Sequence, residues 1–288
     1  MKSKTAAARH QLWRRTKSDL MMGVTVLATV ITLLPLFIIL GYLVAKGASS
    51  LNLAFFFHMP TPVGESGGGM ANAIVGTLEL VALASLMGVP IGIGTGLYLA
   101  AHRNQRFAEI VSFAADVMMG VPSIVVGIFA YAVVVQPVGG FSTLAGAFAL
   151  AVIMIPLVTR TSEEMLLLVP HELREAALAL GVPAWRTTLS VVARTAASGI
   201  ATGVILSIAR IAGETAPLLF TAFGNRFWST SLTQPISSLT VQVYTYAISP
   251  FPDWQRQAWA GALVLTAIVL MLELGVRWVT RGSARVAR

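Results

Sequence analysis

Long apolar stretches alternate with short polar segments along most of this chain. Crossing the hydrocarbon core of a bilayer takes about 20 residues of α-helix, and six stretches approach or exceed that length. The pattern therefore predicts an all-α polytopic membrane protein with six transmembrane helices. These helices are expected at about residues 20–45, 71–101, 108–135, 141–158, 196–220 and 258–279.

Four polar segments flank or connect these spans. A basic N-terminus covers residues 1–19, and a basic tail covers residues 281–288. Two longer loops, 46–70 and 222–256, contain Pro and aromatic residues, and we expect both on the extracytoplasmic side. The run Phe55–Phe57 in the first loop is expected along the membrane interface.

The segment 171–195, between the fourth and fifth spans, is polar without being rich in Gly and Pro. It predicts two short helices. The first ends at Gly181, and the second carries Pro183 in its first turn, where the missing N–H of proline is tolerated. A helical hairpin on the face of a membrane protein needs something to contact, so this segment is a candidate docking surface.

Composition supports the membrane class. Hydrophobic residues make up 56% of the chain and charged residues 11%, with a mean hydropathy of +0.78. Soluble domains contain about 25% charged residues, so this chain lacks the polar surface of a water-soluble globule. Cysteine is absent, which excludes disulfides and Cys-ligated metals, and the scatter of the four histidines argues against a metal cluster.

Lys and Arg are unevenly distributed between the two sides of the predicted membrane. With both termini in the cytoplasm, 16 of the 20 lie in inner segments, three in outer loops and one, Arg210, within a span. This asymmetry follows the positive-inside rule and places the 171–195 hairpin in the cytoplasm. It also accounts for the net charge of +8 without a nucleic-acid partner.

The sequence contains no motif for using ATP. None of its four lysines follows a Gly-rich loop of the form G-x-x-x-x-G-K-[ST]. The glycines of the run Gly92–Gly96 lie inside an apolar helix with no strand before it, so we interpret them as a site of close helix packing rather than a dinucleotide loop. We therefore predict that this chain has no enzymatic activity of its own.

Five ionisable residues are expected at or near membrane depth, where charge is costly and each such residue is a candidate for function. They are Glu79, Asp116, Arg210, Glu214 and Glu273. The spacing of Arg210 and Glu214 places both on one face of the fifth helix. At 1.5 Å per residue, Arg210 lies roughly 21 Å from the start of that helix, just past the middle of the span.

Arg210 and Glu214 are the sharpest candidate site. A guanidinium can hold an oxyanion by two parallel N–H bonds. Glu214 can hold the arginine in an empty site or accept a hydrogen bond from a protonated oxyanion. A local break near Gly213 and Pro217 would free backbone groups to line a path. The alternative is a structural ion pair that joins helices or subunits.

Part of the hairpin resembles a known signature. Glu175-Ala176-Ala177, three further residues and Gly181 are similar to the EAA motif, EAA-x3-G-x9-I-x-LP, of type I ABC importer permeases. The resemblance implies that Glu175, Ala176, Ala177 and Gly181 belong to a loop that docks a cytoplasmic ATPase. The sequence departs from the motif at its end, where Val191 replaces Ile and Ala193-Arg194 replaces Leu-Pro. This departure leaves the angle at which the fifth helix begins open.

Longer runs resemble one branch of that family, the PstA-type permeases of phosphate-specific importers. The similarity extends over about residues 20–280. The runs that carry it are 67–100, 120–131, 155–170, 209–222, 227–232 and 249–261.

This resemblance implies the type I importer transmembrane fold over residues 71–280, in the inner membrane of a bacterium. It also implies inorganic phosphate import, with the charged pair Arg210 and Glu214 tied to translocation. Glu79 is a further candidate for the path because of its expected membrane depth. The implied partners are a homologous second permease, two ATPase subunits that bind ATP and Mg, and an extracytoplasmic phosphate-binding protein. The first helix is expected to wrap around the second permease. No cofactor is expected on this chain itself.

Other functions remain open on the residues alone. A permease of the same architecture for sulfate or molybdate would also use a buried arginine. A proton-coupled secondary transporter could use Arg210 and Glu214 as a relay, although the docking hairpin argues against it. A membrane scaffold or sensor would not require a buried charge pair.

Overall fold

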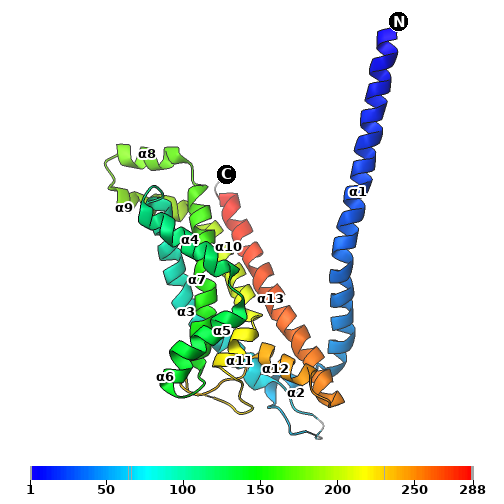
Figure 1. Ribbon diagram of the computed structural model, residues 1–288, viewed down its shortest axis with the longest axis vertical. Helices are drawn as coiled ribbons and strands as arrows, with labels where there is room; N and C mark the ends of the chain where they lie inside the picture. Colours follow the sequence, from blue (N-terminus) through cyan, green and yellow to red (C-terminus); the bar gives the residue numbers. More distant parts are fainter. Residues whose placement is uncertain (1, 64, 66, 230, 287–288) are drawn as a thin grey trace.

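The computed structural model describes residues 2–63, 65, 67–229 and 231–286, with side chains described between 13 and 275. This part of the chain is helical and contains no strand, only one isolated bridge between Phe223 and Ile236. Helix α1 (Lys2–Gly47) stands apart from a bundle formed by the remaining helices (Figure 1). The all-α prediction is confirmed.

Among the residues that the structure describes, five single helices are long and apolar enough to cross a membrane. They cover Trp13–Ser50, Ala71–Ala101, Thr143–Leu167, Ala184–Ala212 and Pro252–Gly275. These ranges correspond to α1, α3 (Ala71–Ala101), α7 (Thr143–Leu167), the stretch ending in α10 (Ala193–Ala212), and α13 (Pro252–Val286). A sixth span forms if the bent pair Arg106–Gly120 and Ser123–Val138 is counted as one.

The third span differs from the continuous helix predicted at 108–135. Helix α4 (Arg106–Gly120) ends, Val121 and Pro122 are extended, and α5 (Ser123–Ala130) leaves at 104°. Proline lacks an N–H and disfavours helical geometry in the residue before it. A π-helical turn at Tyr131–Val135 and the short α6 (Gln136–Val138) complete this span.

The centre of the bundle is the contact between α3 and α7. Gly88, Gly92 and Gly96 recur every fourth residue on α3 and face α7. A Cβ added to Gly92 would lie 2.6 Å from the Cβ of Val158, so no larger residue fits without movement. The packing prediction is confirmed for Gly92 and Gly96, whereas Gly94 has no neighbour within 4 Å. Small residues let these helices approach closely.

The segment 222–256 is more than the polar loop that the sequence predicted. It contains α12 (Leu239–Ala247), in which Leu239, Val241 and Tyr246 are buried. The ring of Tyr246 stacks on Trp254 with centroids 4.5 Å apart. This helix packs against α13, so part of the segment 222–256 belongs to the hydrophobic core.

The first loop also contributes to the core. A 3₁₀ turn (Ala48–Ser50) follows α1, and α2 (Leu53–Phe57) begins after Asn52, whose side chain accepts a hydrogen bond from the N–H of Phe55. Phe55 is buried, whereas Phe57 is exposed. The interfacial prediction for the Phe55–Phe57 run is therefore wrong for Phe55, which packs inward.

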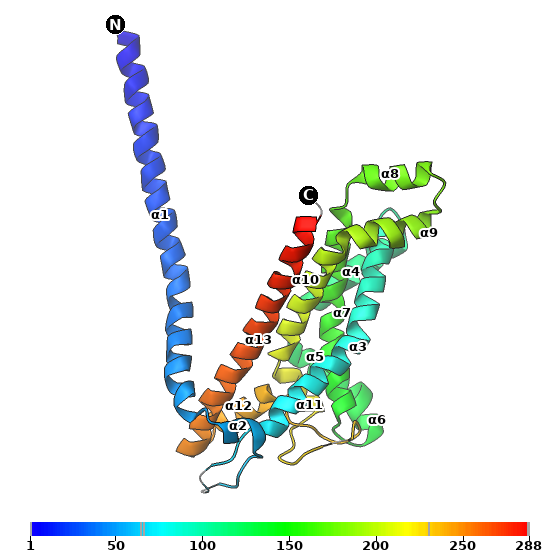
Figure 2. The ribbon, with the colours of Figure 1, turned by 180° about the vertical axis from the view of Figure 1, so that it is seen from behind.

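The predicted hairpin forms at the end of the bundle where both chain ends lie (Figures 1 and 2). It consists of α8 (His171–Ala179) and α9 (Ala184–Thr187), joined at Gly181, whose φ of +79° suits glycine. Pro183 lies one position before α9 rather than inside it. A π-helical turn at Thr188–Val192 then leads directly into α10.

Candidate functional site

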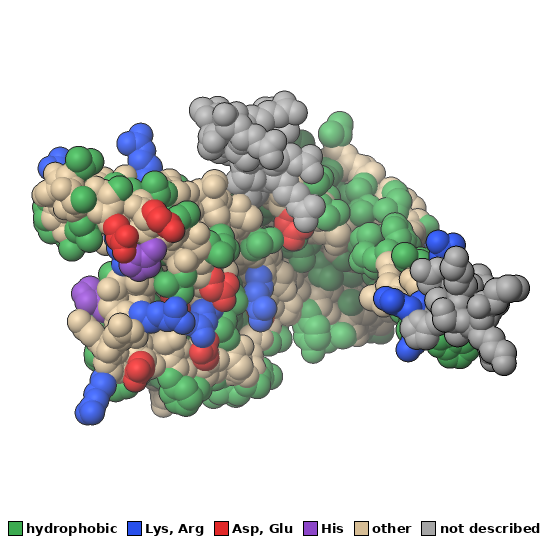
Figure 3. Space-filling view, turned by 90° about the horizontal axis from the view of Figure 1, so that it is seen from above, with side chains coloured by type: hydrophobic (Ala, Val, Ile, Leu, Met, Phe, Trp, Pro, Cys, Tyr) green, Lys and Arg blue, Asp and Glu red, His purple; other side chains and the backbone are tan. Residues whose placement is uncertain are grey.

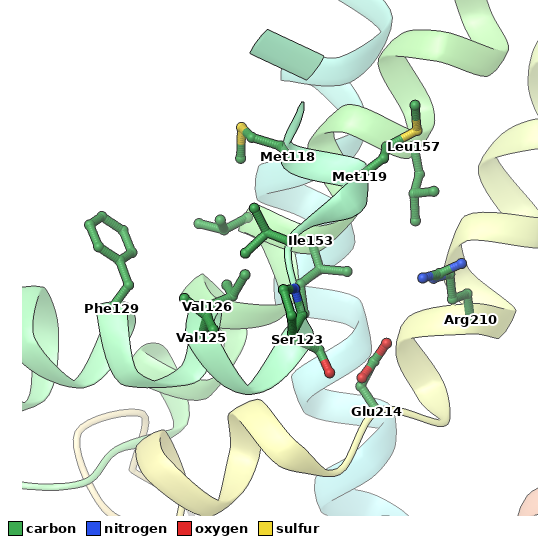
Figure 4. Close-up of a pocket in the computed structure, with 13 residues that line it drawn as sticks. Met118, Met119, Ser123, Val125, Val126, Phe129, Ile153, Leu157, Arg210 and Glu214 are labelled. Atoms are coloured by element: carbon green, nitrogen blue, oxygen red, sulfur yellow. The ribbon is translucent and has the colours of Figure 1, made fainter. Parts of the chain in front are cut away.

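A cavity of about 410 Å³ lies where the bent α4–α5 pair meets α7 and the end of α10 (Figure 4). Three of its lining side chains are polar: Ser123, Arg210 and Glu214. The remaining lining residues are apolar, namely Met118, Met119, Val121, Pro122, Val125, Val126, Phe129, Val152, Ile153 and Leu157. An apolar cavity with a few convergent polar groups is the usual form of a small-molecule site.

Arg210 and Glu214 reach this cavity from two different local structures. Helix α10 ends at Ala212, so Arg210 lies in its last turn, and α11 (Ala216–Thr221) begins after Glu214. The prediction that both residues share one face of a continuous helix is therefore wrong. The structure has a break at Gly213–Thr215, where the sequence analysis considered what a break would do but predicted a span at 196–220.

The two charged side chains extend into the same space beside Ser123 (Figure 4). Arg210 is exposed to the cavity, and Glu214 is half-buried. Among the described residues, neither forms an ion pair with a separation of 4.0 Å or less. Within the described part of this chain, the two side chains therefore do not form the closed ion pair between helices, and the alternative of an ion pair between subunits stays a prediction.

The break at Glu214 is held by the segment that was expected to be a loop. The hydroxyl of Thr240 on α12 donates to the backbone carbonyl of Glu214 at 2.9 Å. The N–H of Glu214 donates to the carbonyl of Ile211 at 3.1 Å. Since a break exposes backbone groups that need partners, Thr240 is a supporting residue that the sequence analysis missed.

Ser123 was also missed. It begins α5 immediately after the Pro122 bend, and this bend turns it toward the cavity. A hydroxyl can both donate and accept hydrogen bonds, so Ser123 complements the donors of Arg210 and the acceptors of Glu214. The Pro122-Ser123 pair is a signal for a helix start in the sequence. The direction in which this helix, α5, then runs depends on the fold.

Glu79 and Glu273 lie away from this cavity. Glu79 is half-buried on α3, and Glu273 is half-buried on α13. Neither lines the cavity that contains Arg210 and Glu214. The path role of Glu79 therefore stays a prediction, without a contact at this site.

Asp116 belongs to a separate ionic cluster centred on Arg160, a residue that the sequence analysis did not select. One guanidinium nitrogen of Arg160 donates to Asp116 at 2.7 Å. The other donates to Glu163 at 2.7 Å and to the hydroxyl of Ser112 at 3.1 Å. Glu163 is buried, and the cluster ties α4 to α7. Because α7 continues to Leu167, Arg160 lies within the helix rather than at its end.

The EAA residues lie on the first helix of the hairpin. Ala177 is buried, whereas Glu175 is exposed and lies 3.6 Å from the ring of His171. Leu180 and Trp185, on either side of the Gly181 turn, are 84% and 67% exposed. The hairpin therefore presents both apolar and charged groups outward, as a docking surface would.

The region that departs from the EAA motif has a defined geometry. Residues Thr188–Val192 form a π-helical turn, and Ala193 begins α10 without a break. With Arg194 in place of proline, no missing N–H interrupts the helix. The hairpin is thus joined to the helix that carries Arg210.

In the described part of the chain, no group of three or more His, Asp or Glu is arranged to hold a metal ion. The cavity offers guanidinium, carboxylate and hydroxyl groups. A guanidinium can bind an oxyanion through charged hydrogen bonds.

Similar solved structures support this fold. A chain of the MetNI methionine ABC transporter in an inward-facing conformation matches with a TM-score of 0.61, covering 74% of this chain and 96% of that chain at 20% identity. An amino acid ABC transporter crystallised with histidines gives a TM-score of 0.53 at 19% identity, covering 74% of this chain and 91% of that chain. At these identities the likeness concerns the fold alone.

Sequence relatives are considerably closer. A phosphate transport system permease protein PstA of Yersinia pestis is 47% identical over 93% of this chain and 91% of its own length. A PstA of Haemophilus influenzae is 46% identical over 92% of this chain and 94% of its own length. A probable PstA of Methanocaldococcus jannaschii is 33% identical over 96% of this chain and 99% of its own length.

The sequence profile described as the binding-protein-dependent transport system inner membrane component matches residues 88–285. That range contains the cavity, the ionic cluster and the hairpin, whereas α1 and α2 lie outside it. On this match and the identities above, the chain belongs to the family of binding-protein-dependent inner membrane transport components, in the branch of the PstA permeases.

Proposed function

We propose that this chain is the permease subunit of an ATP-driven importer of inorganic phosphate. The observation that carries this proposal is the apolar cavity into which Arg210, Glu214 and Ser123 converge at a break between helices. The relatives named as phosphate transport permeases support phosphate as the substrate.

In this mechanism, Arg210 holds the phosphate through two N–H bonds, and its fixed charge offsets the charge of the anion. Glu214 accepts a hydrogen bond from a protonated phosphate oxygen, and Ser123 bonds a further oxygen. Release follows when α10 moves and separates Arg210 from Ser123, since the two residues belong to different helices.

The energy comes from ATP hydrolysed on a separate ATPase dimer, which docks through Glu175, Ala176, Ala177 and Gly181. The second hairpin helix, α9, continues through the π-helical turn into α10. Displacement of α8 is therefore passed through the Gly181 turn to α9 and from there along one continuous helical segment to Arg210. Helical segments transmit displacement because their packed interiors resist deformation.

The remaining partners follow from the exposed surfaces. Apolar side chains of α1 are exposed along most of the helix, whereas Gly47 at its end lies against Trp259 and Leu263 of α13. We assign the exposed face of α1 to lipid and to a homologous second permease subunit. An extracytoplasmic phosphate-binding protein delivers the substrate, and both termini lie in the cytoplasm of the bacterial inner membrane.

Phosphate uptake tests the substrate site directly. The complete complex is reconstituted in vesicles, and ATP-dependent uptake of labelled phosphate is compared between wild type and Arg210→Gln. Loss of the bidentate charged contact is expected to reduce uptake by about 100-fold, on the order of the 1.5–3 kcal/mol of a charged hydrogen bond. Arg256→Gln, which removes an arginine paired with Asp253 outside the cavity, is the control. Normal uptake by assembled Arg210→Gln complexes would exclude Arg210 from the path.

The docking role is tested on the hairpin. Glu175→Lys reverses an exposed charge without removing buried packing, so it is expected to weaken co-purification of the ATPase while the permease still assembles. Gly181→Val, at a φ of +79°, is expected to do the same by straining the turn. Unchanged assembly and transport in both variants would place the dock elsewhere.

Sulfate or molybdate is the alternative substrate class. Near neutral pH both dianions lack the acidic proton that hydrogen phosphate carries. Glu214 could therefore accept no hydrogen bond from either of them, and its only charged partner in the cavity would be Arg210. Competition by excess sulfate or molybdate against labelled phosphate separates these alternatives. Uptake driven by a proton gradient without ATP would instead support the secondary-transporter hypothesis.

A further inference from the structure

A second cavity, of about 490 Å³, lies at the hairpin end of the molecule. It is bounded by the connection between α3 and α4 and by the start of α8. Arg103 and Arg174 line it together with His102 and His171, and no Asp or Glu side chain does. Figure 3 looks onto this end and shows basic and acidic side chains side by side. The absence of acidic side chains from the lining of this cavity is therefore a local arrangement.

Two helix N-termini meet at the same cavity. Gln105 precedes α4 and Pro170 precedes α8, and both residues line the cavity. Neither helix has a side-chain cap on its first N–H groups. The first amides of a helix lack partners and carry partial positive charge, so they favour an anion. Glu109 and Glu172 lie in these first turns but do not line the cavity.

The C-terminus of α3 also borders the cavity, through Ala100, Ala101 and His102, and the carbonyl of Tyr98 near this end has its own partners. The backbone N–H of His102 donates to the carbonyl of Tyr98 at 3.0 Å, and the His102 Nδ1 lies 3.2 Å from the same oxygen. The imidazole also stacks on the Tyr98 ring at 4.7 Å. These contacts occupy the carbonyl and fix the ring at the cavity edge.

The neighbouring cavity around Arg160 makes a useful contrast. It also includes Arg103, but Glu109, Asp116 and Glu163 line it, and Arg160 is fully paired. An anion would meet three carboxylates there. At the hairpin cavity Arg174 is half-buried, and His171 lies 3.6 Å from the exposed Glu175, which does not line the cavity.

We propose that the hairpin cavity binds inorganic phosphate from the cytoplasm and that its occupancy slows transport. A phosphate held between Arg103 and Arg174 would join the α3–α4 connection to α8, two elements otherwise separated by this cavity. Since α8 also carries Glu175, a bound anion restrains the hairpin relative to the bundle. The inference rests on the proposed function, because phosphate is then the product that accumulates on this side.

The test uses the complete complex in proteoliposomes of neutral lipid, oriented with the hairpin end inside. The initial rate of labelled phosphate uptake and the rate of ATP hydrolysis are measured with and without millimolar unlabelled phosphate inside. Both rates are expected to fall by about fivefold or more in wild type, the low end of typical coupling between sites. Hydrolysis is included because isotope dilution does not affect it.

In Arg103→Gln/Arg174→Gln the internal phosphate is expected to lose this effect while uptake without internal phosphate persists. Arg186→Gln, on the same hairpin but outside the cavity, is expected to respond as wild type does. Binding of labelled phosphate to ATP-free complexes provides a second measurement, in which the double variant should bind less than Arg186→Gln.

The outcomes separate the two proposals. Complexes that take up no phosphate at all would overturn the proposed function. Active complexes whose rates ignore internal phosphate, or a double variant still inhibited like wild type, would overturn the inference alone. Inhibition that appears only with anionic lipid, and not with free phosphate, would also overturn it, because the cavity would then hold a lipid headgroup.

Discussion

Two arginines within membrane-spanning helices have opposite surroundings in this molecule. Arg160 is bound by Asp116, Glu163 and Ser112 and joins α4 to α7. Arg210 lies at the end of α10, beside a cavity, without an ion pair of 4.0 Å or less among the described residues. Both positions are costly for a charge. The first cost is offset inside the protein, and in the proposed function the substrate offsets the second.

The two sites are also physically linked. Asp116 lies two residues before Met118, and Met118 and Met119 form part of the wall facing Arg210. The Arg160 cluster thus fixes the α4 segment that leads into the bend at Pro122. In the proposed mechanism this wall stays in place while α10 moves, so that the shape of the site changes.

The largest expected effect is on stability, from Arg160→Gln. This change leaves the carboxylate of Glu163 buried and removes its partner, which costs about 3 kcal/mol for a buried pair. The thermal unfolding midpoint of the purified permease is expected to fall by several degrees, whereas Arg210→Gln should leave it unchanged. The double variant Arg160→Gln/Glu163→Gln should recover part of the loss. Equal destabilisation by Arg160→Gln and Arg210→Gln would remove the distinction between the two arginines.

The sequence predicted the features that depend on local pattern. The span 71–101 matches α3 residue for residue. Gly213 and Pro217 drew attention to the position of the break, although the span 196–220 was predicted across it. The hairpin followed from a polar interruption with Gly181 at its turn. For α3 and the hairpin, a run of neighbouring residues was enough to determine the local geometry.

Features that depend on distant partners were not predicted. Arg160 and Asp116 are 44 positions apart, and their pairing requires α4 to lie beside α7. Pro122 signals a bend, but the direction of α5 depends on Gly127 packing against Pro217. Helix α12 is only nine residues long, and its buried Thr240 finds its acceptor 26 positions away. Tertiary contacts determined all three.

A smaller effect is expected from Glu214→Gln. The amide keeps the size of the side chain but loses the charged acceptor, so phosphate uptake should fall by about tenfold, as expected for one charged hydrogen bond. Sulfate should compete with labelled phosphate more strongly in the variant, because the group that favours a protonated oxyanion is gone. Glu65→Gln, an exposed position in the first loop that does not line the cavity, serves as the control. An unaltered preference for phosphate over sulfate would show that Glu214 does not accept a hydrogen bond from the protonated phosphate oxygen.

The smallest expected effect comes from Thr240→Val, which tests whether α12 supports the substrate arginine through the helix break. The variant keeps the shape of the side chain but removes the 2.9 Å hydrogen bond to the Glu214 carbonyl. A neutral hydrogen bond contributes about 1 kcal/mol, so uptake should fall by about fivefold or less while the unfolding midpoint changes little. Thr245→Val is the matched control, since its hydroxyl bonds only the Val241 carbonyl within the same helix. If both variants transport equally, the break is held by other contacts. If only Thr240→Val is slower, the open geometry around Arg210 depends on α12, just as the closed geometry around Arg160 depends on α4.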